Sequence, residues 1–256
     1  MRNTDQADEI WSFCHTKRKN LRPEQVGKLG YGDLRTWVAM CPDTRIVVTS
    51  LIGRRDRNSA CQFMADLAPR LLHRIQLTTD GLEAYEEAVY QAFGEDVDYA
   101  MVVKDFAAGT ARWRPISGNP NPDHVSTSLI ERQNLTLRME MRRFTRRSSG
   151  HSKKVENHAA MLALYYTFYN FARPHEGCGG VSPAQAAGLA SRFWKISDIV
   201  GLLDTQNVPP IQKFEFGPVP GTGPPEQVVT WLGKRSYGDR ECFTSESWSS
   251  RRWSPP

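Results

Sequence analysis

The sequence predicts a mixed α/β fold in which three antiparallel strands are followed by alternating helices and strands and then by further helices. Three observations predict it. Short β-favouring runs separated by turn residues occupy residues 7–53. Two segments of helical periodicity follow, and each precedes another β-favouring run. Beyond residue 124, two long helical patterns succeed one another without a strand between them.

The first three strands are expected at residues 7–17, 33–41 and 45–53. β-favouring and polar residues mix in each range, as they do in half-buried strands. Residues 42–44, Pro-Asp-Thr, are typical of a turn between the second and third strands. We therefore expect three consecutive antiparallel strands.

The next elements alternate between helix and strand. A crossover helix is expected to begin at Asn58 as its N-cap and to be interrupted near Pro69. A short strand at 75–80 follows, then a helix at 81–94 and a fifth strand at 99–106. The predicted order is βββαβαβ, followed by helices.

The remaining chain predicts a loop, two long helices and a tail. Gly, Asn and Pro in residues 107–124 indicate a surface loop. Helices are expected at 126–147 and 152–172, the second ended by Pro174. The segment 205–256 is rich in Pro, Gly and Ser and has no usable period, so we expect a flexible tail.

Composition agrees with one soluble domain, residues 1–204, followed by that tail. Hydrophobic residues make up 39% of the 256 residues and charged residues 24%, as is ordinary for globular proteins. No stretch approaches the roughly 18 apolar residues of a membrane span, and the start has no apolar signal core, so we expect a cytoplasmic protein. The five cysteines lack the spacing of zinc or redox sites, which predicts reduced thiols.

Three carboxylates stand out by their positions. Asp8 lies inside the first predicted strand, Asp80 ends the fourth, and Glu131 lies near the start of a long basic helix. Strands one and four are neighbours in the ribonuclease H-like arrangement, so the two aspartates can converge, and a later helix can bring the glutamate. A carboxylate in an apolar strand carries a desolvation penalty unless a positive group meets it, and a hard cation with oxygen ligands is a good candidate. Two divalent ions about 4 Å apart can activate water and stabilise a leaving oxygen in phosphodiester cleavage.

Each carboxylate alone has an ordinary alternative. Asp8 could face solvent beside Glu9, as charged strand residues usually do. Asp80 could be a helix N-cap before Gly81. Glu131 could be an exposed helical acid paired with a nearby arginine. The prediction of a metal site depends on the three together.

A basic segment follows the third carboxylate. The chain carries a net charge of +5, whereas residues 131–154 alone hold eight Lys or Arg against two Glu. On a helix, Glu131, Arg138 and Arg142 would share one face. Cations crowded at this density favour contact with DNA phosphates. The alternative is a solvated helix face that only aids solubility.

Several segments, taken in order, resemble one known family. The DDE transposases of bacterial insertion sequences of the insertion-sequence-one type have three similar acidic blocks and a similar helical segment, over about residues 7–204. The acidic blocks are Asp8-Glu9-Ile10-Trp11-Ser12, Leu77-Thr78-Thr79-Asp80-Gly81 and Ser126-Thr127-Ser128-Leu129-Ile130-Glu131-Arg132-Gln133-Asn134. The helical segment includes Arg142-Arg143-Phe144-Thr145-Arg146, Lys153-Lys154-Val155-Glu156-Asn157-His158 and Tyr169-Asn170-Phe171-Ala172-Arg173-Pro174-His175.

The resemblance implies a ribonuclease H-like fold and a metal-dependent reaction. Asp8, Asp80 and Glu131 would be catalytic ligands of Mg²⁺ or Mn²⁺, with two ions expected. The metals would activate water to free a 3′ hydroxyl at the element's end, and that hydroxyl would then attack target DNA. The partners would be element ends and target DNA in a nucleoid-associated homo-oligomer. The expected DNA-binding residues are Asn134, Arg138, Arg142, Arg143, Arg146, Lys153 and Lys154.

Two features depart from the family, and two rival functions stay open. Transposases of this type resemble multi-domain proteins with an N-terminal part that recognises the element's ends, whereas here Asp8 is almost at the first residue. We therefore expect an N-terminally truncated copy. The loop at 107–124 also looks shortened.

One rival is an inactive remnant that binds DNA nonspecifically, and the other is a ribonuclease H-like nuclease that only hydrolyses. Around Pro174, a structural role as helix stop is favoured over a contact of His175 with DNA.

Overall fold

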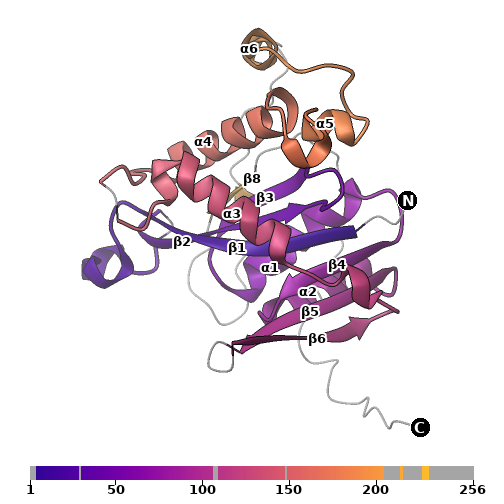
Figure 1. Ribbon diagram of the computed structural model, residues 1–256. Coiled ribbons are helices and arrows are strands. Elements are labelled where there is room, and N and C mark those ends of the chain that lie inside the picture. The colour runs from indigo at the N-terminus through magenta and orange to yellow at the C-terminus, as the bar shows by residue number, and fades with distance from the viewer. Residues whose placement is uncertain are drawn as a thin grey trace, which may run out of the picture.

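A mixed β-sheet with helices on both faces forms the centre of the protein (Figure 1). The computed structural model describes residues 4–28, 30–105, 109–147, 149–204, 214–215 and 227–230. Helices α1 and α2 cover one face of the sheet, and α3 and α4 cover the other, so the apolar core is divided into two layers. The mixed α/β class predicted from the sequence is confirmed.

Six strands from the first half of the chain make up most of the sheet, in the order β6-β5-β4-β1-β2-β3. Strand β1 is central, antiparallel to β2 and parallel to β4. This order is compatible with a ribonuclease H-like arrangement. The strands are β1 (Thr4–Cys14), β2 (Gly32–Met40), β3 (Val47–Gly53), β4 (Ile75–Asp80), β5 (Val97–Asp105) and β6 (Thr110–Ser117).

Two short strands from the expected tail extend the sheet beyond β3. Strand β8 (Gln227–Thr230) pairs with β3, and β7 (Phe214–Glu215) pairs with β8. The rest of the segment 205–256 lies outside the described residues, and the prediction of a flexible tail stays a prediction.

The predicted loop at 107–124 is wrong in its central part, because β6 there pairs with β5 as an antiparallel edge strand. Pro115 is tolerated in this strand because it lies at an irregularity in the pairing, opposite Ala100. Gly118 ends the strand with φ +67°, and a Cβ there would lie 2.7 Å from the carbonyl oxygen of Val97. The turn-forming residues therefore bound a strand instead of filling a loop.

The two crossover helices, α1 (Arg57–Leu67) and α2 (Ala84–Phe93), occur where helices were predicted. The N-cap of α1 is Asp56, whose carboxylate accepts a hydrogen bond from the Ser59 amide at 2.8 Å. The prediction of Asn58 as the cap was therefore wrong by two residues. Large fully buried side chains fill this layer, namely Phe63, Met64 and Leu67 from α1, Tyr85 from α2, and Trp37 and Tyr99 from the sheet.

The first helix of the other layer, α3 (Ser128–Glu140), is shorter than the predicted 126–147. Met141 is extended, with φ −112° and ψ 108°, and the chain then makes a short 3-10 turn. Met141 and Phe144 are both buried in the core on this side of the sheet. The prediction that Glu131, Arg138 and Arg142 share one helical face is wrong, because Arg142 lies beyond the helix.

The second predicted helix is confirmed as α4 (Val155–Thr167), which continues as a π-helical turn at Phe168–Ala172 and stops before Pro174. Two smaller helices follow, α5 (Pro183–Ala186) and α6 (Ile196–Asp204). The 3-10 turns are at Arg18–Asn20, Pro23–Gln25, Ala68–Arg70, Pro122–His124, Arg142–Phe144 and Glu176–Cys178. No helix within the described ranges is long and apolar enough to cross a membrane.

Candidate metal centre

The central strand β1 carries two neighbouring acids in its middle. Asp8 shares a face with Gln6, whose side-chain oxygen accepts a hydrogen bond from the Ile130 amide of α3 at 3.0 Å. Glu9 alternates to the α1 side, where it meets Arg55. Glu9 is only 7% exposed and Asp8 is half-buried, so the alternative that Asp8 faces solvent is wrong.

Asp80 ends β4 beside these two acids. The parallel pairing of Ala7 with Thr79 brings the next residue of each strand, Asp8 and Asp80, to the same edge. Asp80 accepts a hydrogen bond from the Leu82 amide at 3.2 Å, whereas α2 begins only at Ala84. Asp80 therefore shapes the turn after β4 and is not the N-cap of α2.

One carboxylate oxygen from each of Asp8, Glu9 and Asp80 lies within 4.8 Å of the others, and we call these three residues the acidic cluster. Oxygen atoms gathered at this spacing could hold a divalent cation. The sequence predicted Asp8 and Asp80 but missed Glu9, because neighbouring strand residues point to opposite faces. Asp80 at a strand end can be reached from both faces, which brings Glu9 into the cluster.

Glu131 lies beside the cluster but outside it. It occupies the first turn of α3, where its Oε1 accepts hydrogen bonds from Lys104 Nζ and Thr127 Oγ1, both at 2.5 Å. Burial is the main cause of the raised pKa values of Asp8 and Asp80, and the negative charge of Glu131 adds a smaller increase to both. The ion pair with Lys104 differs from the expected alternative of pairing with arginine.

Burial makes the acidic cluster expensive to ionise without a cation. Desolvation, followed by repulsion from Asp80, raises the pKa of Asp8 to about 6 and that of Glu9 to about 7. Burial also raises the pKa of Asp80. The Asn134 amide lowers the pKa of Asp8, and Arg55 lowers that of Glu9, but neither cancels the desolvation.

A hard divalent cation fits this arrangement. All three donors are carboxylate oxygens, the ligand type that Mg²⁺ and Mn²⁺ prefer. Glu9 Oε1 accepts from Arg55 Nε at 2.6 Å, whereas its buried Oε2 has no hydrogen-bond partner within the part of the chain that the structure describes. A bound cation would satisfy that oxygen and offset the desolvation. Asp8, Glu9 and Asp80 could thus hold one ion.

The predicted DNA-binding residues fall into two groups. Three of them make contacts within the protein: Asn134 Nδ2 donates to Asp8 Oδ2 at 2.8 Å, Arg138 to the Phe144 carbonyl at 3.2 Å, and Arg143 to Ser152 Oγ at 3.0 Å. The other four are exposed and form what we call the basic surface: Arg142, Arg146, Lys153 and Lys154.

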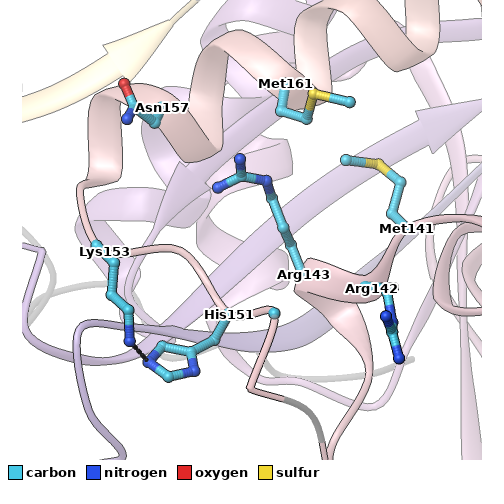
Figure 2. A pocket seen from close by; sticks show the side chains of 8 residues that line it. Met141, Arg142, Arg143, His151, Lys153, Asn157 and Met161 are labelled. Atoms are coloured by element: carbon cyan, nitrogen blue, oxygen red, sulfur yellow. Dashed lines mark hydrogen bonds between the residues drawn. The ribbon is translucent and has the colours of Figure 1, made fainter.

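An open pocket of about 420 Å³ joins part of the basic surface to α4. Figure 2 shows Arg143 projecting between Met141 and the α4 side chains, with Lys153 hydrogen-bonded to His151 at 2.7 Å. None of the lining residues is acidic, so the pocket favours an anion. It is lined by Met141, Arg142, Arg143, Gly150, His151, Lys153, Asn157 and Met161.

The segment around Pro174 has structural contacts. Arg173 forms an ion pair with Glu140 at 2.5 Å. His175 Nδ1 accepts a hydrogen bond from the Gly177 amide at 3.1 Å, and the His175 ring packs edge-on against Tyr169. These contacts support the structural role over the contact with DNA.

Comparison with known proteins adds no family assignment. No protein-family model matches the chain, and no curated protein matches it. The transposase resemblance therefore stays a prediction from the motifs.

Proposed function

We propose that the chain is the catalytic domain of a DDE-type transposase with a ribonuclease H-like fold, which cuts and joins DNA with the help of divalent cations. The observation that carries the proposal is the acidic cluster, three carboxylates within 4.8 Å of one another on the central strands of the sheet. The motifs Asp8-Glu9, Asp80-Gly81 and Glu131 occur in the order that the resemblance requires.

The protein's own residues have distinct roles in this proposal. The acidic cluster holds the first ion, and Asn134 orients Asp8 through its amide. Glu131 is assigned to a second ion, in which case Lys104 exchanges its carboxylate partner for a DNA phosphate. When bound, the ions activate the attacking hydroxyl and stabilise the leaving oxygen.

The basic surface supports DNA as the substrate. Its four cations lie on the segment that follows α3, the helix that carries Glu131, and the pocket beside them extends to α4. Exposed Lys and Arg bind phosphates without reading sequence, which suits an enzyme that must hold many target sites. Arg138 and Arg143 are assigned to hold this segment in place through Phe144 and Ser152.

A remnant that only binds DNA is the second candidate, and one observation favours it. Arg55 and Lys104 form ion pairs with Glu9 and Glu131. Such internal pairing would also stabilise a copy that had lost its metal.

Nicking and strand joining on labelled duplex DNA test the proposal, with Mg²⁺ or Mn²⁺ present or chelated. The variant is Asp80→Asn, and the control is Asp96→Asn, an acid whose side chain is 79% exposed. Metal-dependent nicking that Asp80→Asn abolishes and Asp96→Asn retains would support an enzyme, and joined products would identify a transposase. Hydrolysis without joining would instead support a nuclease. Metal-independent DNA binding without cleavage would support the remnant that only binds DNA.

A further inference from the structure

The edge strand β6 brings an exposed tryptophan into line with the acidic cluster. In the sheet register, Asp80 pairs with Val102 on β5, and Val102 pairs with Trp113 on β6. Residues directly opposite one another across strands point to the same face. Two spacings between neighbouring strands separate the backbones of Asp80 and Trp113, which is about 10 Å.

Contacts on either side of these strands identify the face. Lys104, two residues beyond Val102, bonds to Glu131 on α3, so the even-numbered side chains of this part of β5 lie on the α3 side. Arg114, the neighbour of Trp113, forms an ion pair with Glu86 on α2, on the opposite side. Trp113 therefore lies on the same face as Asp8, Asp80, Lys104 and Glu131.

The Trp113 side chain is not needed by the core. It is 40% exposed, and the β6 residues Thr110–Pro115 are all exposed. Trp37 offers a contrast, because it is fully buried and its indole nitrogen donates to the Arg54 carbonyl at 3.0 Å. An exposed indole on an edge strand beside an acid site is free to contact a substrate.

We propose that Trp113 stacks against an unpaired base of the DNA strand whose phosphodiester lies at the acidic cluster. This inference rests on the proposed function and narrows the substrate to a frayed or single-stranded DNA end. The indole offers a flat apolar surface, and Lys104 beside it supplies a cation for the backbone. Stacking of a base on an aromatic ring tolerates any sequence, but it requires a base that is not enclosed in a duplex.

Binding of a single-stranded oligodeoxynucleotide tests the proposal without any cleavage step. The probe carries 2-aminopurine and a fluorophore, and Ca²⁺ replaces Mg²⁺. We expect Trp113→Ala to weaken binding about tenfold and to remove the quenching of 2-aminopurine, whereas Trp113→Phe keeps most of both. Tyr90→Ala is the matched control, because Tyr90 is an exposed aromatic residue on α2, across the sheet. Thermal unfolding should be the same for all variants.

A second measurement separates this proposal from the proposed function. Cleavage with Mg²⁺ is compared on a duplex with an unpaired end and on a fully paired duplex. We expect the unpaired end to be cleaved faster by the wild type, and Trp113→Ala to remove that advantage. Cleavage and binding that are equal in wild type and Trp113→Ala would overturn the role of Trp113 and leave the metal-dependent function standing. Binding that depends on Trp113 without any cleavage would support stacking and overturn the enzyme. If the wild type neither binds nor cleaves the DNA, both the stacking proposal and the proposed function are overturned.

Discussion

The acidic cluster lies on buried central strands, whereas the basic surface projects from an exposed segment between α3 and α4. Each cluster residue is fixed by strand pairing and by a named partner, such as Arg55 for Glu9. The four cations of the basic surface are exposed. Chemistry that needs placement within fractions of an ångström belongs on the strands, and phosphate attraction needs only charge near the surface. The two regions should therefore respond differently to substitution.

The largest expected effect is the loss of a carboxylate from the cluster. Removing a hydrogen-bond partner of a metal ligand typically lowers metal affinity or activity 10–100-fold. Asp80→Asn removes the charge of a ligand itself, so it should lower the rate of metal-dependent cleavage by more than about 100-fold. DNA affinity in the absence of metal should change little. Cleavage rates and fluorescence anisotropy measured on one preparation check both parts. If Asp80→Asn lowered DNA affinity as much as the cleavage rate, the two regions would not have the separate roles proposed here.

The partner of Asp8 should have a smaller effect. Asn134→Ala removes the amide that donates to Asp8 at 2.8 Å, and we expect about tenfold weaker metal binding with the fold retained. Titration calorimetry with Mn²⁺ measures it. Thr136→Ala, two residues further along α3, is the control, since its hydroxyl donates to the Arg132 carbonyl of its own helix. Unchanged Mn²⁺ affinity in Asn134→Ala would remove Asn134 from the site.

The basic surface should respond in small, similar steps. Arg142→Ala and Arg146→Ala should each weaken DNA binding a few-fold for any sequence, and each should lower the slope of log affinity against log salt by about 1. Binding measured over a series of salt concentrations checks this. Arg192→Ala, on the exposed Arg192–Asp198 ion pair far along the chain, is the control. An unchanged slope would mean that these arginines do not contact phosphates.

The smallest expected effect is a change of the protein's stability with pH. Asp8 and Glu9 have folded pKa values of about 6 and 7, above the ordinary 3.8 and 4.5, so the folded state binds more protons. Their contribution to stability is full below the ordinary values and is lost as pH rises towards 7. His158 acts in the opposite sense, because burial lowers its pKa to about 4 and its contribution is lost as pH falls below 6.5.

Glu9→Gln isolates the carboxylate contribution. Between pH 5 and 7, with metal chelated, the wild type should lose stability relative to Glu9→Gln, as urea unfolding would measure. Added Mg²⁺ should stabilise the wild type more at pH 7.5 than at pH 5.5, because the ligands must be deprotonated to bind it. Parallel pH curves for the two proteins would contradict the raised pKa of Glu9.

The same contrast explains what the sequence could predict. Apolar periodicity is a local pattern. It therefore predicted the order βββαβαβ of helices and strands along the chain, and it placed Asp8 in the first strand and Asp80 at the end of the fourth. Strand β6 was missed because turn residues dominate 107–124, and the pairing that makes β6 a strand is a contact with β5. The end of α3 was missed because arginines are good helix formers, and the buried residues Leu137, Met141 and Phe144 keep the spacing of a helical face.

The composition of the candidate site was only partly visible for a similar reason. Alternation along a strand separates Glu9 from Asp8, and only the end of β4 brings both within reach of Asp80. Glu131 was placed near the cluster by order along the chain, but its pairing with Lys104 depends on the end of β5 coming close to the first turn of α3. The density of Lys and Arg in the sequence indicated the basic segment, but it did not indicate which of these side chains are exposed.

Counting bound Mn²⁺ by electron paramagnetic resonance at pH 7.5 tests the central claim most directly. The proteins are the wild type, Asp80→Asn, Glu9→Gln and the exposed control Asp96→Asn. We predict at least one tightly bound Mn²⁺ per chain in the wild type and the control, and strongly weakened binding in the two cluster variants. No bound Mn²⁺ in the wild type, or binding that both cluster variants keep, would contradict a metal centre at Asp8, Glu9 and Asp80.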